Sequence, residues 1–145
     1  MKQSALAILA LCVTAAPAAA DFTFKVPVEI RDAPAVDQFR VECQVARTLH
    51  DGRPNRQTTV ARGASRYTRI TNGEYSGTLT IEAKGGGFYG ASEGRYWICV
   101  LEVQGRTRTG GRFSTRWDLF ETIYREATGG TIKEATYSVQ GEVTR

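Results

Sequence analysis

Hydrophobic and polar residues alternate along several stretches of this chain. The first such stretch has five apolar residues in one phase: Phe22, Phe24, Val26, Val28 and Ile30. Because successive side chains of a β-strand point to opposite faces, this pattern predicts a half-buried strand over residues 22–30. Pro27 cannot donate a backbone hydrogen bond, so we expect this strand at the edge of a sheet.

The period of two recurs further along. It predicts strands near residues 39–47, 75–83, 95–105 and 135–143. Residues 49–56 consist of turn-forming types and predict a loop, whereas residues 57–71 are weakly patterned and allow one or two short strands. Asn72-Gly73 predicts a tight turn. The 95–105 strand is apolar on both faces, which indicates a central strand or one with a covered back.

The hairpin after residue 105 has two candidate registers. A two-residue turn would put Arg112 and Arg116 beside the core side chains, and burying an unpaired arginine is costly. A three-residue loop at residues 109–111 pairs Thr107 with Phe113 instead, at the small cost of a glycine bulge. We expect this second register, because one step flips every side chain to the other face. It gathers four arginines on one outer surface: Arg106, Arg108, Arg112 and Arg116.

The hydrophobic period changes between residues 118 and 128. Asp118 with Glu121 resembles a capping box, and the apolar residues that follow recur on one helical face before Gly129. The pattern predicts one short helix near residues 119–128. We expect it to cover the back of the strand that contains Ile98 and Val100.

The first 20 of the 145 residues have the features of a secretory signal peptide. Lys2 gives a positive start, an apolar stretch follows, and small residues precede a cleavage site near Ala20. The apolar stretch is too short to span a membrane, and Leu11 is too bulky for lipoprotein processing at Cys12. We therefore expect no transmembrane segment and an extracytoplasmic location, periplasmic or secreted. The remaining residues 21–145 have the length of a single domain.

Two cysteines remain after this cleavage, Cys43 and Cys99. An even number in an exported chain predicts a disulfide bond. The alternative is a catalytic thiol or a metal site. Zinc needs three or four ligands, whereas residues 21–145 supply two cysteines and one histidine, His50. We expect the disulfide, and neither a metal nor a cofactor.

Short strands, frequent turns and a bond between an early and a late strand resemble the immunoglobulin family. The separation of Cys43 and Cys99 is similar to that of the family's inter-sheet bridge. Trp97 stands where the family's tyrosine corner would have a tyrosine. The resemblance implies an all-β fold for residues 21–145, an immunoglobulin-like antiparallel β-sandwich.

The formal net charge of +4 falls to +3 when residues 1–20 with Lys2 are removed, and this excess is too small to predict nucleic-acid binding. The expected cluster of Arg106, Arg108, Arg112 and Arg116 has two interpretations. It is either an ordinary solvated face or a site for an anionic glycan, a lipid headgroup surface or an acidic envelope protein, because guanidinium groups pair well with carboxylate and phosphate. A second group of arginines lies scattered through the weakly patterned region and is weaker evidence for a binding surface: Arg53, Arg56, Arg62, Arg66 and Arg69.

The glycine-rich segment 85–90 matches G-x-G-x-x-G. A nucleotide-binding loop of this kind needs a helix after it, whereas a strand follows here. Phe88 and Tyr89 in this loop either stack on a sugar ring or partner surface, or fold back onto the domain.

Catalytic chemistry has few candidate residues. His50 lies in a predicted turn without a buried acid or a strained serine nearby, and Asp118, Glu121 and Glu126 are explained by helix capping and solvation. The leading hypothesis is an exported, non-catalytic binding module that uses the 84–94 loop and the arginine hairpin. The alternatives are a small secreted hydrolase or enzyme inhibitor, and a structural subunit of an envelope assembly that pairs through the 22–30 edge.

Overall fold

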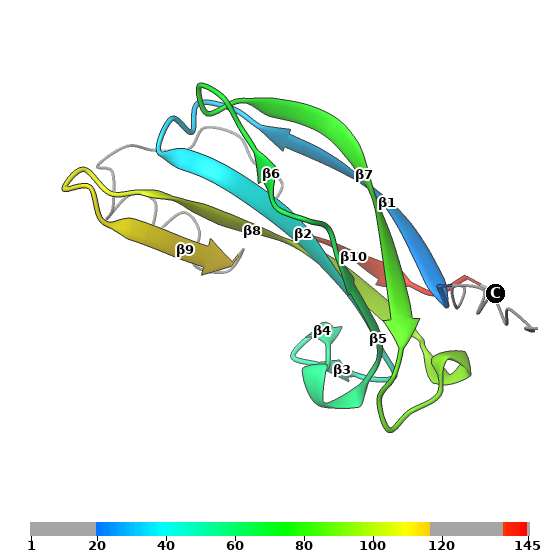
Figure 1. Ribbon diagram of the computed structural model, residues 1–145. Coiled ribbons are helices and arrows are strands. Elements are labelled where there is room, and N and C mark those ends of the chain that lie inside the picture. The colour runs from blue at the N-terminus through cyan, green and yellow to red at the C-terminus, as the bar shows by residue number, and fades with distance from the viewer. Residues whose placement is uncertain (1–19, 117–137, 145) are drawn as a thin grey trace, which may run out of the picture.

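The computed structural model describes residues 20–116 and 138–144, and they form an antiparallel β-fold (Figure 1). Ten strands and two 3₁₀ turns follow one another in these residues. They are β1 (Phe22–Ile30), β2 (Val36–Ala46), β3 (Leu49–His50), β4 (Arg53–Pro54), η1 (Arg56–Thr58), β5 (Thr59–Ala64), β6 (Thr68–Arg69), β7 (Tyr75–Gly85), η2 (Ala91–Glu93), β8 (Tyr96–Arg106), β9 (Arg112–Arg116) and β10 (Ser138–Glu142). The predicted helix at 119–128 lies outside the described residues.

The main sheet has the order β1-β7-β5-β2-β8-β10. The short strand β6 also pairs with β2, and β9 also pairs with β8, while β3 and β4 form a separate two-stranded sheet. The strands predicted over 22–30, 39–47, 75–83 and 95–105 are confirmed, β5 and β6 are the two short strands allowed within 57–71, and β10 lies within the strand predicted over 135–143. The predicted 49–56 loop contains the small β3–β4 hairpin. Among the described strands β1 pairs only with β7, which places Pro27 in an edge strand as expected.

The core lies between the β1–β7 ribbon and the β2–β8 pair. β7 pairs with β5 only at two positions, so the ribbon leaves the sheet and crosses its inner face; Figure 1 shows β7 meeting β5 at one end and diverging from β2 toward the other. The inward residues of all four strands are buried in one cluster that includes Val28, Phe39, Val41, Ile81 and Leu101. The remaining side chains of β2 and β8 therefore lie on the opposite, outer face of these two strands, away from the core.

The predicted disulfide is present between Cys43 and Cys99, with an S–S distance of 2.04 Å. The two cysteines are direct partners in the register of the neighbouring strands β2 and β8. The bond therefore lies within one sheet, whereas the immunoglobulin bridge joins two facing sheets. Trp97 packs against the same core, with its ring centroid 5.5 Å from that of Phe24.

The predicted register of the β8–β9 hairpin is wrong by two residues. Gly105, not Thr107, pairs with Phe113, and the connection spans residues 107–111 with hydrogen bonds between Thr107 and the glycines. The reason is steric. A Cβ atom on Gly105 would lie 1.9 Å from the carbonyl oxygen of Ala35 and 2.8 Å from the Phe113 ring, so only glycine leaves room for this ring. A shift by two residues preserves the faces, so Arg106 and Arg112 still point outward.

Candidate functional site

The outer face of the β2–β8 pair carries mainly polar side chains, together with the apolar Ile98 and Val100. Outward positions of β2 are Gln38, Arg40, Glu42 and Gln44, and those of β8 are Ile98, Val100, Glu102, Gln104 and Arg106. Most of these side chains are buried or half-buried. Polar groups with so little exposure need hydrogen-bond partners on the protein or on a ligand.

A hydrogen-bonded chain crosses the centre of this face. Gln38 Nε2 donates to Gln104 Oε1 (2.7 Å), and Gln104 Nε2 donates to the Tyr67 hydroxyl oxygen (2.8 Å). The Tyr67 hydroxyl donates in turn to Glu102 Oε1 (2.7 Å). Arg40 Nε donates to Glu102 Oε2 (2.8 Å), and the Arg40 guanidinium lies over the Tyr67 ring. These bonds fix the side chains of β2, β8 and the β5–β6 connection relative to one another.

Glu102 is the buried charged residue within the described part of the chain, with 8% of its surface exposed. Its hydrogen bond to Arg40 raises the pKa of the Arg40 guanidinium above the ordinary arginine value. The Arg40 guanidinium therefore stays charged, and the Arg40–Glu102 pair lies between two cavities on the same face.

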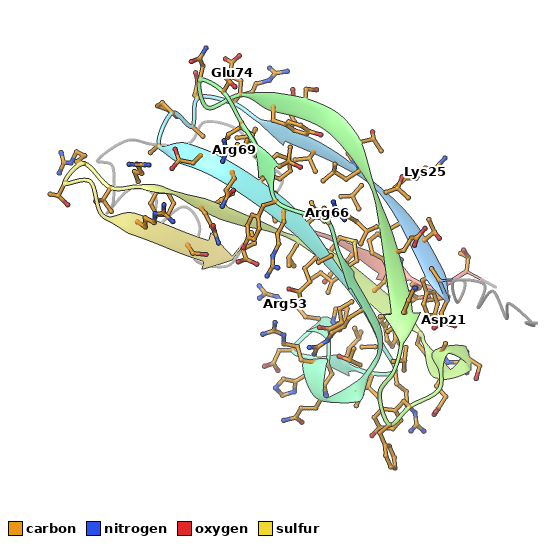
Figure 2. All side chains as sticks on the ribbon, in the orientation of Figure 1. Asp21, Lys25, Arg53, Arg66, Arg69 and Glu74 are labelled. Carbon is orange, nitrogen blue, oxygen red and sulfur yellow. A yellow bond between two sulfur atoms is a disulfide. The ribbon has the colours of Figure 1, made fainter. Side chains whose placement is uncertain are left out.

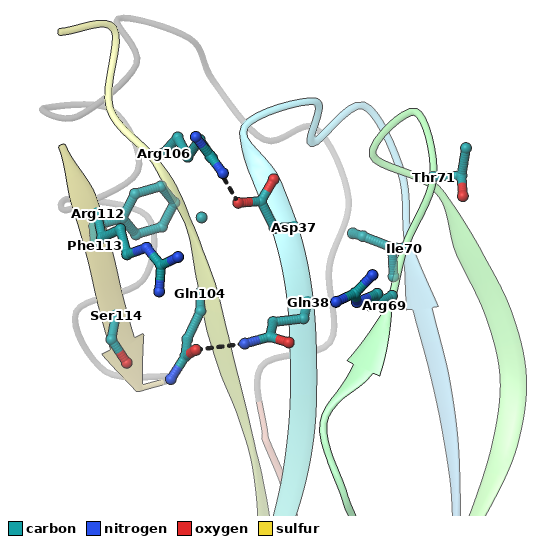
Figure 3. A pocket seen from close by; sticks show the side chains of 11 residues that line it. Asp37, Gln38, Arg69, Ile70, Thr71, Gln104, Arg106, Arg112, Phe113 and Ser114 are labelled. Atoms are coloured by element: carbon teal, nitrogen blue, oxygen red, sulfur yellow. Dashed lines mark hydrogen bonds and ion pairs between the residues drawn. The ribbon is translucent and has the colours of Figure 1, made fainter. Parts of the chain in front are cut away.

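The first cavity, here called the arginine pocket, has a volume of about 830 Å³. Three arginines from three strands line it: Arg69 of β6, Arg106 of β8 and Arg112 of β9. The other lining residues are Asp37, Gln38, Ile70, Thr71, Gln104, Gly105, Phe113 and Ser114. Figure 3 shows Arg69 and Arg112 entering from opposite sides, with Gln38 and Gln104 between them.

The charges of the arginine pocket are unbalanced. Asp37 is the single carboxylate among its lining residues, and it lies 3.4 Å from Arg106 Nε. Both side chains of this pair are more than half exposed, so solvent weakens their attraction. The pocket thus combines an excess of guanidinium groups with amide and hydroxyl donors, which suits a carboxylate, sulfate or phosphate group.

Backbone contacts hold the arginines in place. Arg106 N donates to Ala35 O (2.9 Å), and Ile70 N donates to Asp37 O (3.0 Å). The first bond ties the end of β8 to the turn before β2, and the second ties β6 to the start of β2. Arg69 and Arg106 therefore project from anchored strand ends.

The structure separates the residues that the sequence suggested as one binding surface. Arg106 and Arg112 line the arginine pocket, whereas Arg108 is exposed in the 107–111 turn and is not a lining residue. Arg116 lies in β9 opposite Glu102, and its side chain is outside the described residues.

Phe88 and Tyr89 belong to the loop that precedes β8, at the end of this strand opposite the β8–β9 hairpin. β8 has 11 residues, so these two aromatics and the arginine hairpin are roughly 30 Å apart. Phe88 is 97% exposed, and Tyr89 packs against the Arg47 guanidinium. The expected combined surface of the 84–94 loop and the arginine hairpin does not form.

Sequence reasoning gave little weight to Arg69 and did not single out Asp37 or the glutamines as site residues. Arg69 is in a two-residue strand whose pairing partner, β2, comes much earlier in the chain. The predicted Asn72-Gly73 turn was the sequence feature that could have indicated where Arg69 lies. Both residues have positive φ, and this turn ends the β6 segment beside the start of β2.

A second cavity, here called the hairpin pocket, lies under the β3–β4 hairpin and has a volume of about 730 Å³. Glu42 and Gln44 of β2 and Ile98 and Val100 of β8 line it. The remaining lining residues are His50, Asp51, Arg53, Pro54, Asn55, Arg56 and Gln57. Figure 2 shows Arg69, Arg66 and Arg53 in succession along this side of the molecule.

His50 does not have the surroundings of a catalytic histidine. Its neighbour Asp51 lies 3.5 Å away, and the two side chains are 76% and 90% exposed. A catalytic acid is normally buried so that it can orient the imidazole ring. Asp118, Glu121 and Glu126 lie outside the described residues.

Residues 20–116 and 138–144 contain no group of three or more histidine, cysteine, aspartate or glutamate side chains that could hold a metal ion. No helix in the same residues is both long enough and apolar enough to cross a membrane.

No protein-family model, curated protein sequence or solved structure matches this chain.

Proposed function

We propose that this chain is an exported, non-catalytic binding module whose arginine pocket holds the acidic group of an anionic ligand. The observation that carries the proposal is the convergence of Arg69, Arg106 and Arg112 from three strands on one cavity that has a single carboxylate. Guanidinium groups bind carboxylate, sulfate and phosphate through paired, charge-assisted hydrogen bonds.

Export is supported by the leader-like first 20 residues and by the Cys43–Cys99 disulfide, which suits an oxidising compartment. The anchored strands of the site support binding rather than chemistry. The outer face offers positioned donors and a rigid floor, and its buried carboxylate, Glu102, is held in an ion pair with Arg40.

The test compares two triple variants with the same loss of charge. One is Arg69→Ala/Arg106→Ala/Arg112→Ala, and the control is Arg62→Ala/Lys84→Ala/Arg95→Ala. The control residues are exposed and line neither pocket. Binding of dextran sulfate and of polygalacturonate is measured by isothermal titration calorimetry at two salt concentrations.

The pocket variant is expected to bind at least about tenfold more weakly than the control, because each lost guanidinium contact contributes on the order of 1 kcal/mol. An equal loss in both variants would mean that only the net charge matters. An unmodified chain that binds neither polymer would refute the proposed function.

A further inference from the structure

Gln44 is the feature of the outer face that the arginine pocket does not explain. Its side chain is 5% exposed and lines the hairpin pocket. Its Nε2 atom has no hydrogen-bond partner within the described part of the chain. Gln38 and Gln104, on the same face, both use their Nε2 donors within the central hydrogen-bonded chain. A buried amide donor without a partner is rare and points to a missing acceptor.

Hydrogen bonds and packing stabilise the β3–β4 hairpin and η1, which cover the hairpin pocket. Asn55 Oδ1 accepts a hydrogen bond from Gln57 N (2.9 Å), and Asn55 N donates to Thr48 O (2.9 Å). β4 lies against β8, and η1 lies against β2. The tip of the hairpin is also bonded to β10, where Gln140 Nε2 donates to Gly52 O (3.4 Å). The pocket has a suitable size for a small ligand or one to two sugar units.

The lining chemistry differs from that of the arginine pocket. Arg53 and Arg56 are balanced by Glu42 and Asp51, so the hairpin pocket has no excess of charged arginine over carboxylate. Ile98 and Val100 give it an apolar floor. An uncharged sugar ring fits this combination, because its hydroxyl or acetamido oxygens can accept from Gln44 Nε2 while its C–H face packs on the aliphatic side chains.

The two pockets lie on one face of the same strand pair. The arginine pocket includes Gln104 and Arg106 of β8, and the hairpin pocket includes Ile98 and Val100 of that strand. Six residues along a strand correspond to about 20 Å, a distance that an extended oligosaccharide can span.

We propose that the hairpin pocket is a subsite for an uncharged sugar unit of an acidic glycan whose acidic group occupies the arginine pocket. This inference rests on the proposed function and extends it from an anionic group to a class of ligand. Such a glycan alternates acidic and neutral units, and Gln44 recognises the neutral unit by donating a hydrogen bond to one of its oxygen atoms.

The decisive variant is Gln44→Met, which keeps the approximate volume of the side chain and removes the donor. Three probes are titrated by calorimetry: a hyaluronan oligosaccharide with alternating uronic acid and N-acetylglucosamine, an all-acidic oligogalacturonate, and a neutral chito-oligosaccharide. The melting temperature of each free chain is recorded as well. Arg56→Ala is the second variant, because Arg56 lines the pocket but is exposed, so its loss is expected to leave the fold intact.

The unmodified chain is expected to bind the alternating oligosaccharide more tightly than the all-acidic one. Gln44→Met is expected to weaken binding of the alternating probe about tenfold and to leave binding of the all-acidic probe unchanged. The free variant is expected to melt at the same or a higher temperature, because a buried donor without a partner has been removed. Arg56→Ala is expected to weaken binding of the alternating and neutral probes.

The subsite is refuted if Gln44→Met binds the alternating probe as well as the unmodified chain does, or if it melts at a lower temperature and weakens both acidic probes alike. These outcomes leave the arginine pocket standing as long as the all-acidic probe binds. If the neutral probe binds and the all-acidic probe does not, the hairpin pocket is a site but the proposed function is wrong. Binding of none of the three overturns both.

Discussion

At the level of single residues, the buried carboxylate of Glu102 organises the outer face between the two pockets. It accepts hydrogen bonds from Tyr67 and Arg40, and Arg40 also lies over the Tyr67 ring. Removing one member of such a buried group leaves the others partly unsatisfied. The stability of the site is therefore concentrated in a few side chains.

Replacement of Arg40 with methionine tests this. We expect the free energy of unfolding to fall by about 2 kcal/mol, because the Glu102 carboxylate loses a charge-assisted hydrogen bond in a poorly solvated position. Chemical denaturation provides the measurement. Arg62→Met, at an exposed position of β5, is the control and should change stability by less than about 0.5 kcal/mol. Equal effects of the two substitutions would contradict a special role for the Arg40–Glu102 pair.

The pH dependence of this difference follows from the raised pKa of Arg40. A group whose pKa is raised by folding contributes stability that is fully present below its unfolded pKa and is lost as the pH rises through its folded pKa. Both values are strongly alkaline for arginine. The stability difference between the unmodified chain and Arg40→Met should therefore be constant between about pH 7 and 9. A steady decline over this range would show that the guanidinium is not the group involved.

At the level of elements, the path of β7 decides the shape of the molecule. It crosses the inner face of the sheet together with β1 and pairs with β5 only through its last two residues. Gly63 of β5 lies at this corner. A Cβ atom there would be 2.1 Å from the carbonyl oxygen of Glu82, so the close approach of the two backbones requires glycine.

Gly63→Ala is expected to lower the free energy of unfolding by about 3 kcal/mol, since backbone atoms of β7 would have to move. Gly86→Ala is the matched control, because a Cβ atom added there would have open space within 4 Å and the φ of Gly86 is not positive. Thermal unfolding monitored by circular dichroism compares the two. If Gly63→Ala unfolds at the same temperature as the control, the inferred close approach of the β5 and β7 backbones is contradicted.

The elements also show which parts of the fold could be predicted from the sequence alone. Alternation was sufficient for β1, β2, β7 and β8, because each of these strands directs one face toward the core and its side chains repeat with a period of two. The faces of the β8–β9 hairpin were predicted correctly for the same reason. Its register was not, because it depends on the fit of the Phe113 ring over Gly105, a contact between residues that no local pattern encodes.

The candidate site was predictable only in part. Arg106 and Arg112 were found because both lie on one hairpin. Arg69 was given little weight and Gln44 was not singled out, since their positions in the pockets come from the pairing of β2 with β6 and β8, which follow much later in the chain. The separation of Phe88 from the arginine hairpin could have been inferred from the sequence, because the 84–94 loop precedes the predicted 95–105 strand and the hairpin follows it.

At the scale of the whole molecule, one covalent bond joins the two strands that form the floor of both pockets. Cys43 and Cys99 are 56 residues apart in sequence and both are buried. Closing a loop of this length is worth about 4 kcal/mol in the chain-entropy description of disulfides. The bond therefore contributes to the stability of the outer face of β2 and β8 as well as of the core.

Cys43→Ala/Cys99→Ala is expected to lower the free energy of unfolding by about 4 kcal/mol. Urea denaturation of the oxidised chain, the reduced chain and the variant measures this. Reduction should destabilise the unmodified chain by a similar amount and leave the variant unaffected. A reducing agent without effect on the unmodified chain would mean that the bond is not formed in the purified protein.

The proposed function requires that the outer face of β2 and β8, rather than another surface, binds an anionic ligand. A ¹⁵N-edited NMR titration of the assigned chain with the anionic oligosaccharide that it binds best locates the binding surface residue by residue. We expect the largest shifts on residues of the arginine pocket, among them Gln38, Arg69, Gln104, Arg106 and Arg112. Shifts confined to the Phe88 loop or to the β1 edge would contradict the proposal.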